Sequence, residues 1–261
     1  MARSLLTTIR DLHRRRGRER RGLALAEGIR LVEEALAAGV PVRGAASSPA
    51  LDGTPRGKAL KAALAAAGVP LLEVTIGELD ALADTEQPQG VVAVVEPPAW
   101  TLGDLPAGPG SVILVLDAVQ DPGNVGTMLR TALGLGAAGL VALAGTAELA
   151  NPKVVRGSMG ALFRLRAVDA SPGDFLEWAR GAGVHLWVAS AQGVPLRRAA
   201  LDVRARRPPV ALVVGNEGAG TSPAIEAAAE RRIAIPLAPG VESLNVAVAA
   251  GILLHEVLRD D

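Results

Sequence analysis

The chain has 261 residues, of which 49% are hydrophobic and 21% charged, so it can build a hydrophobic core and does not have the composition of a disordered protein. It contains no cysteine and three histidines, which excludes disulfides, thiolate metal sites and cysteine nucleophiles, and we expect no metal. The N-terminus lacks an apolar signal region, and no stretch approaches the roughly 18 apolar residues of a membrane span. We therefore expect a cytoplasmic protein with no membrane partner.

The net charge of zero hides an uneven distribution. Residues 1–21 hold eight arginines and two acidic residues, a local charge of +6, which leaves −6 for the rest of the chain. Such a cluster can neutralise several phosphates, although a solvated helix face or a tail would show the same pattern. We expect six of its arginines to contact RNA: Arg14, Arg15, Arg16, Arg18, Arg20 and Arg21. With only five aromatic residues, binding by base stacking is disfavoured.

The first hundred residues alternate between helical and strand patterns, which predicts a small α/β domain. The predicted helices cover residues 27–39, 58–68 and 75–84, and the predicted strands cover 41–47, 69–74 and 90–96. A segment with four prolines and three glycines follows at 97–110 and reads as a linker. We place the first domain at 1–98 and the linker at 99–110.

The remaining residues, 111–261, contain strands that are apolar on both faces and are separated by helices. This pattern predicts a parallel sheet that is covered by helices on both sides. The predicted strands lie near 111–119, 140–145, 184–190, 209–215 and 232–238, and the predicted helices near 127–137, 151–160, 174–183, 222–232 and 243–259.

Three loops after these strands hold most of the unusual polar residues, where parallel sheets bind ligands. The first, 121–126, contains Asn124 and leads to Arg130, which projects from an apolar helical stretch and would need an anion or structural acceptors if it were buried. Asn124 is placed either to cap the following helix or to hold a substrate. None of these features defines a reaction alone.

The second loop, 215–220, is rich in glycine and contains Glu217, and the third, 235–247, contains Ser243 and Asn245. The glycines imply a close backbone approach, either to a ligand or within an ordinary turn that enters a helix. Their spacing does not match the G-x-G-x-x-G fingerprint, which argues against a Rossmann dehydrogenase. Ser243 can be an N-cap, whereas the Asn245 amide needs hydrogen-bond partners.

In this order, the segments DAVQDPGNVGTMLRTALGLG, LVVGNEGAG and IAIPLAPGVESLNVAVAAGILL resemble the three motifs of the SpoU (TrmH) family of RNA ribose methyltransferases. The resemblance covers residues 111–261. The segment ALAEGIRLVEEAL also resembles the substrate-binding domain of many family members, a fold like certain RNA-binding ribosomal proteins. The implied fold class is α/β, with a deep trefoil knot closing the C-terminal domain, an exception to the rule that chains do not thread.

The resemblance also implies a cofactor and a set of site residues. The cofactor is S-adenosylmethionine, bound at Val214, Gly215, Glu217, Gly218, Ile235, Leu237, Leu244 and Asn245. The implied catalytic residues are Arg130, Asn124, Glu217, Ser243 and Asn245, with Ala247 replacing a second serine found in many members. The family arginine is proposed as a general base, but arginine stays protonated at neutral pH, so we expect Arg130 to position phosphate and ribose.

Family members are dimers, and we expect a homodimer that uses the apolar terminal helix, although ordinary core packing would give the same pattern. RNA would also contact a stretch without acidic residues that contains Lys153, Arg156, Arg164 and Arg166. We expect ribose 2′-O-methylation of ribosomal RNA. The alternatives are a tRNA ribose methyltransferase and a non-catalytic RNA-binding or ribosome-assembly protein of the same fold.

Overall fold

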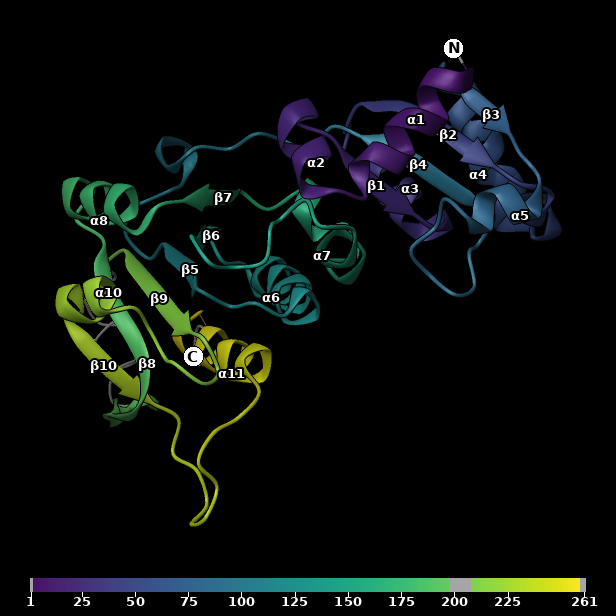
Figure 1. Ribbon diagram of the computed structural model, residues 1–261. Helices are drawn as coiled ribbons and strands as arrows, with labels where there is room; N and C mark the ends of the chain where they lie inside the picture. The colour runs from purple at the N-terminus through teal and green to yellow at the C-terminus, as the bar shows by residue number, and fades with distance from the viewer. Residues whose placement is uncertain (1, 198–207, 259–261) are drawn as a thin grey trace. The chain divides into compact units, whose positions relative to one another are not determined.

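The computed structural model describes residues 2–197 and 208–258, which group by their contacts into two units (Figure 1). The first unit consists of the chain up to Pro98 together with Ala150–Arg164, and the second consists of Ala99–Leu149 and the chain from Leu165 onward. The first unit ends at Pro98, where we placed the end of the first domain, but the proline-rich segment 99–110 groups with the second unit instead of forming a separate linker. The segment 150–164, which we placed in the second domain, groups with the first unit.

The first unit contains a four-stranded sheet in the order β1-β4-β2-β3. Strands β2 and β3 are parallel, while β4 pairs antiparallel with β1 and β2. Its elements are α1 (Ala2–Leu12), α2 (Arg15–Arg21), β1 (Ala24–Glu27), α3 (Ile29–Ala37), β2 (Val42–Ser47), the 3-10 helix η1 (Pro49–Gly53), α4 (Pro55–Ala66), β3 (Leu71–Glu73), α5 (Ile76–Asp80), β4 (Val91–Val95), α7 (Pro152–Gly157) and η3 (Ala161–Phe163).

The core of this sheet explains why the sequence folds this way. Helix α1 buries Ile9 and Leu12 against Val92 and Val94 of β4, so its apolar stripe covers one face of the sheet. Strand β1, which the sequence pattern did not predict, ends directly before α3. Gly28 lies between them with φ of +94°, a conformation that a side chain would strain, and it allows the abrupt change from strand to helix.

The segment 150–164 completes the first unit through α7, which packs on β1. Val154 and Val155 of α7 are fully buried. A guanidinium nitrogen of Arg156 donates a hydrogen bond to Asp84 at 3.1 Å. Gly160 has φ of +89°, and a Cβ there would lie 2.6 Å from the Glu34 Cβ, so glycine is required for this close approach. Residues from the middle of the chain are thus part of the N-terminal core.

The second unit contains a six-stranded sheet in the order β10-β8-β9-β5-β6-β7, in which every neighbouring pair is parallel. This confirms the predicted parallel sheet. Its elements are η2 (Leu102–Asp104), β5 (Val112–Asp117), α6 (Pro122–Leu135), β6 (Gly139–Leu143), β7 (Ala167–Ala170), α8 (Pro172–Gly181), β8 (His185–Pro195), β9 (Val210–Gly215), α10 (Pro223–Ala228), β10 (Arg231–Ala234) and α11 (Val246–Leu258).

Helices cover both faces of this sheet. Phe175 of α8 and Ile225 of α10 pack with Val115 and Val213 on one face. Helices α6 and α11 contact each other and the strands β5, β6 and β9, and the alternation of side chains along a strand assigns them to the opposite face (Figure 1). The short edge strand β7 escaped prediction because its exposed Asp169 interrupts the apolar pattern. No helix in the described part of the chain is long and apolar enough to cross a membrane.

We predict that replacing Val154 and Val155 together with alanine destabilises the N-terminal unit, although both residues lie far beyond residue 98. The loss of four buried methyl groups should lower the free energy of opening β1 by about 2–4 kcal/mol. Native-state hydrogen exchange measures this change in the amides of β1. The matched control replaces Val115 and Val141, which should affect β5 and β6 instead; unchanged protection in β1 would refute the assignment of α7.

Candidate functional site

The site is organised by the parallel pairing of β5 with β9. The register places Asp117, the last residue of β5, beside Gly215, the last residue of β9. The loops that follow the two strands therefore begin at the same edge of the sheet, as expected for parallel strands. These loops contain two of the three polar segments that the sequence singled out.

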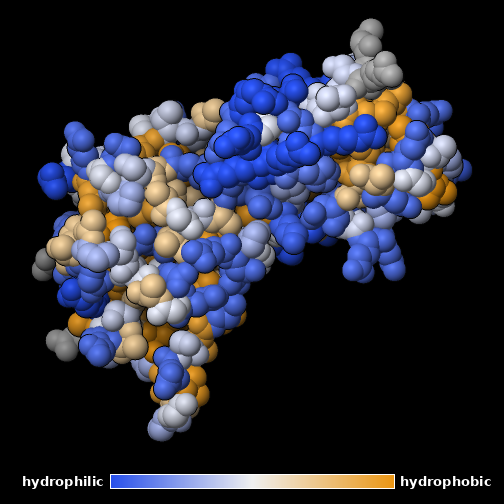
Figure 2. Space-filling model, viewed as in Figure 1, coloured by the Kyte–Doolittle hydropathy of each residue, from blue (hydrophilic) through white to orange (hydrophobic). Residues whose placement is uncertain are grey.

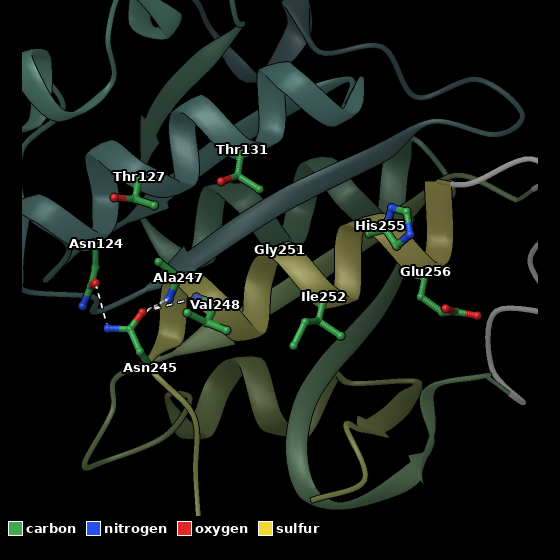
Figure 3. Close-up of a pocket in the computed structure, with 10 residues that line it drawn as sticks. All are labelled: Asn124, Thr127, Thr131, Asn245, Ala247, Val248, Gly251, Ile252, His255 and Glu256. Atoms are coloured by element: carbon green, nitrogen blue, oxygen red, sulfur yellow. Dashed lines mark hydrogen bonds between the residues drawn. The ribbon is translucent and has the colours of Figure 1, made fainter.

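Three of the predicted catalytic side chains form one hydrogen-bonded chain. The Nδ2 of Asn124 donates to a Glu217 carboxylate oxygen at 2.7 Å. The Nδ2 of Asn245 in turn donates to the Asn124 Oδ1 at 3.0 Å, and Figure 3 shows these two amides facing each other. The structure thus brings together one residue from each of the three segments.

Helix capping explains why Asn124 is available for this role. Asp121 is the N-cap of α6 and accepts a hydrogen bond from the Asn124 backbone N–H at 2.7 Å, so the Asn124 side chain is not the cap. At the third segment, Asn245 precedes α11 rather than lying inside it. Its Oδ1 accepts from the N–H groups of Ala247 and Val248, which makes Asn245, and not Ser243, the capping residue.

Arg130 and Ser243 do not join this hydrogen-bonded chain. Arg130 lies on α6 with an exposed side chain, so the possibility that it is buried and structurally paired is wrong for this chain. Ser243 is exposed in the loop before α11. Neither side chain has a hydrogen-bond or ion-pair partner among the described residues, and both are therefore accessible to a ligand.

The glycine-rich loop of the second motif is closed by reciprocal main-chain hydrogen bonds between Asn216 and Gly220, both 2.9 Å. A Cβ on Gly215 would lie 2.4 Å from the Gly220 carbonyl carbon, so this glycine is required for loop closure. Gly218 has room around it, since a Cβ there would come no closer than 3.6 Å to Asn216. Sequence reasoning did not single out Asn216, whose side chain hydrogen-bonds to the backbone of two different loops. Its only sequence signal was its place next to Glu217.

The third segment leaves main-chain groups accessible. Across residues 236–244, the one hydrogen bond between main-chain groups of the described chain runs from Val241 N–H to the Ala238 carbonyl. Leu237 and Val241 are 36% and 48% exposed, which is unusual for apolar side chains. Val214, by contrast, is buried in β9, so only its main chain can contact a ligand. Main-chain donors and acceptors beside apolar side chains suit a nucleoside-like molecule.

A groove of about 560 Å³ runs between α6 and α11 next to this site (Figure 3). It begins at Asn124 and Asn245 and continues along α11, where Val248 and Ile252 are 53% and 39% exposed. The groove is lined by Asn124, Thr127, Thr131, Asn245, Ala247, Val248, Gly251, Ile252, His255 and Glu256.

The arginines of the N-terminal cluster have different environments. Arg18 is only 5% exposed and donates hydrogen bonds to the carbonyls of Leu12 and His13, so it joins α1 to α2 and is not the surface residue we expected. Arg20 and Arg21 both pair with Asp11, at 2.7 and 2.8 Å. The hydrogen bond from Arg21, with a smaller contribution from Arg20, lowers the pKa of Asp11.

Of the six arginines expected to contact RNA, two have no ion-pair or hydrogen-bond partner for their side chains among the described residues. Arg15 is exposed but pairs with Glu19 at 2.7 Å. Arg14 and Arg16 are exposed and make no ion pair or side-chain hydrogen bond with the described chain. Strongly hydrophilic side chains cover α2 on the face shown in Figure 2.

The second predicted group of basic residues is mostly engaged within its own unit. Arg156 pairs with Asp84, and Arg164 pairs with Glu34 at 3.0 Å. Arg166 lies over the Trp100 ring, with its guanidinium carbon 5.4 Å from the ring centroid, a cation–π contact. Lys153 is exposed and its ammonium has no partner among the described residues. Within the described ranges, His, Asp and Glu side chains form no group of three that could hold a metal ion.

Comparisons with known proteins match both parts of the chain. Residues 111–255 match the model of the SpoU rRNA Methylase family, and residues 5–93 match the MRM3-like substrate binding domain. The chain is 32% identical to the 23S rRNA (guanosine(2553)-2′-O)-methyltransferase RlmP of Bacillus subtilis, over 95% of this chain and 93% of that protein.

Solved structures of similar proteins cover nearly all of the chain. The AdoMet-bound rRNA methyltransferase from Sinorhizobium meliloti is 31% identical, with a TM-score of 0.84 over 97% of this chain and 93% of that one. The SpoU methyltransferase AviRb from Streptomyces viridochromogenes, in complex with AdoMet, is also 31% identical, with a TM-score of 0.83 over 97% and 96%. The family match covers more than half of the chain and includes all three polar segments, and the chain therefore belongs to the SpoU rRNA methylase family.

Proposed function

We propose that this protein transfers a methyl group from S-adenosylmethionine to a ribose 2′-hydroxyl of ribosomal RNA. The observation that carries this proposal is the hydrogen-bonded chain from Asn245 through Asn124 to Glu217, which unites the three family motifs. A non-catalytic protein would have no need to keep these polar side chains together. Similar proteins that span both units are named as 23S rRNA methyltransferases, which favours ribosomal RNA over tRNA.

The loops at the carboxyl ends of β9 and β10 fit the cofactor. The exposed main chain of residues 236–244 and the apolar side chains of Leu237 and Val241 suit an adenosine group. We assign binding to the main chain of Val214, Gly215, Gly218, Ile235, Leu237 and Leu244, together with Glu217 and Asn245. When bound, S-adenosylmethionine supplies an electrophilic methyl group that an oxygen nucleophile can attack directly.

The protein's own residues then position the RNA. Arg130 is exposed and unpaired in the described chain, so its guanidinium can bind phosphate or ribose oxygens in a bidentate manner. Because arginine keeps its proton at neutral pH, we assign Arg130 to positioning rather than to proton removal. Ser243 and the amides of Asn124 and Asn245 supply neutral donors and acceptors near the ribose.

The chain path after β10 supports a knotted C-terminal domain. Strand β10 lies at the edge of the sheet, yet α11 returns to pack on β5 and β9 in its middle. We propose that this return passes through a loop of the domain and forms the trefoil knot of the family. The knot would hold the third segment against the first two and so stabilise the site.

The function is tested by mapping ribose 2′-O-methylation in ribosomal RNA from cells with and without the gene. We expect one modification to disappear without the gene and to return when the natural protein is supplied. Arg130→Ala should transfer methyl groups about 100-fold more slowly, since a misplaced ribose loses its orientation for attack. Arg130→Lys keeps the charge but not the bidentate geometry, and it should recover only part of the rate.

Calorimetry provides the control for these variants. The exposed Arg130 side chain makes no hydrogen bond or ion pair with the described chain, so both variants should bind S-adenosylmethionine as tightly as the natural protein. Transfer at the natural rate by Arg130→Ala would exclude a catalytic role for this residue. A methylation map that is the same with and without the gene would favour the non-catalytic alternative, and a change confined to tRNA would reassign the substrate.

The RNA is proposed to bind the N-terminal unit through Arg14 and Arg16, with Lys153 as a further contact. Each arginine that neutralises one phosphate releases bound counterions, so Arg14→Ala or Arg16→Ala should weaken RNA binding. Each variant should also reduce the slope of log affinity against log salt by about 0.7–0.9. Filter binding or anisotropy over a salt series measures both quantities.

Arg56 provides a matched control on the same unit, because it is exposed but its guanidinium is hydrogen-bonded to the Glu33 carboxylate. Arg56→Ala should leave RNA binding and its salt dependence unchanged. An equal loss of RNA affinity in Arg56→Ala would show that the RNA responds to the overall positive charge of the unit and not to the surface of α2. Arg18→Ala should act differently and lower stability, because Arg18 links α1 to α2.

We also propose that a second copy of the chain covers the groove between α6 and α11. The exposed Val248 and Ile252 adjoin the site, and apolar side chains in this position are typical of a homodimer interface. Val248→Glu together with Ile252→Glu should convert the dimer to monomers, as measured by light scattering, because each subunit would bury carboxylates against an apolar partner.

Ile76 of α5, which is also 53% exposed, offers the control for this change. Ile76→Glu adds one carboxylate at an exposed apolar position in the first unit and should leave the dimer intact, whereas either Val248→Glu or Ile252→Glu alone, which adds the same single charge, should weaken it. If the natural protein is a monomer under conditions in which it methylates RNA, the dimer proposal fails.

A further inference from the structure

Asn216 occupies a connecting position that the roles of the other site residues do not explain. Its Nδ2 donates to the carbonyl of Ala118 at 3.1 Å, in the loop after β5. Its Oδ1 accepts from the N–H groups of Gly218 and Ala219, at 2.9 and 3.0 Å, in its own loop. One side chain therefore both shapes the turn that carries Glu217 and ties that turn to the neighbouring loop.

The residue that receives this bond is itself in an unusual conformation. Ala118 has φ of +57°, in the left-handed region that residues other than glycine rarely adopt. Such a conformation persists only where the surrounding contacts hold it, and it is concentrated at functional sites. The bond from Asn216 is one of the contacts that point the Ala118 carbonyl toward the second loop.

The other end of the Glu217 loop is held by the adjacent residue of β5. Asp117 is 1% exposed, and its carboxylate accepts a hydrogen bond from the Ser222 N–H at 2.6 Å. The last residue of β5 and the one after it thus anchor both ends of the segment 216–222. Between these anchors, Glu217 receives the hydrogen bond from Asn124 at 2.7 Å.

We propose that Asn216 is a positioning residue that holds Glu217 and the loop 215–220 in the geometry required for cofactor binding and methyl transfer. This inference rests on the proposed function. Asn216 acts through the Ala118 carbonyl and the loop backbone, so it need not touch the ribose or the methyl group. Asparagine suits the position because one amide supplies both a donor and an acceptor.

Two substitutions separate the halves of this role. Asn216→Ala removes both the donor and the acceptor, whereas Asn216→Asp keeps an acceptor for Gly218 and Ala219 but loses the donor to Ala118. We expect both variants to bind S-adenosylmethionine about tenfold more weakly in calorimetry, and to show at least a tenfold lower kcat at saturating cofactor. Such losses in both quantities indicate misplacement of Glu217 as well as of the binding loop.

The control is Asn151→Ala. Asn151 is the N-cap of α7, and its Oδ1 accepts from the Lys153 N–H at 2.9 Å, so it makes a comparable side-chain bond in the other unit. This variant should lower the melting temperature by a few degrees while leaving cofactor affinity and kcat unchanged. It measures the effect of losing a side-chain hydrogen bond that supports only the fold.

Two outcomes would overturn the proposal. In the first, either Asn216 variant keeps its cofactor affinity and kcat within twofold of the natural protein. In the second, either variant loses only thermal stability, as Asn151→Ala does. If Asn216→Asp has the cofactor affinity and kcat of the natural protein while Asn216→Ala does not, the bond to Ala118 does not position the loop. The Asn216 inference is tested by the cofactor affinity and kcat of each variant relative to those of the natural protein. If the natural protein itself fails to bind S-adenosylmethionine or to methylate RNA, that result counts against the proposed function.

Discussion

The parallel pairing of β5 with β9 is the constraint on which the site depends. It ends with Asp117 opposite Gly215, so two loops that are about a hundred residues apart in the sequence begin side by side. The Asp117 carboxylate and the Ala118 carbonyl then hold the two ends of the Glu217 loop. A shift of one residue in this register would turn the inward side chains outward and separate these partners.

Neutral amides connect the three loops. Asn124, Asn216 and Asn245 each donate one hydrogen bond to a different segment, and the Oδ1 of each accepts at least one more. An amide can both donate and accept without the desolvation cost of a charge, which suits the proposed binding of a positively charged cofactor and an anionic RNA at this site. Glu217 is the one carboxylate in the chain of bonds that joins the three motifs, and its position is set by the amides around it.

The N-terminal unit shows how tertiary contacts change the meaning of a charge cluster. The arginines there look equivalent in sequence, yet Arg18 is buried at the junction of two helices and Arg20 and Arg21 neutralise Asp11. Only a subset can meet a phosphate without first giving up a protein partner. The same unit is completed by α7, which comes from the middle of the chain and whose two valines are fully buried.

Local pattern was sufficient to predict the parallel sheet, most helices and the loops that contain Asn124, Glu217 and Asn245, because continuous apolar strands and helix signals are encoded over a few residues. It did not predict β1 and β7, and it did not single out Asn216, whose side chain bonds to a residue 98 positions away. It predicted the helix within 150–164 but placed that segment in the other unit. Strand register and packing decide which amide caps a helix, which arginine is free and which loops touch. Because register and packing bring together groups that are distant in sequence, only the tertiary structure determines these features.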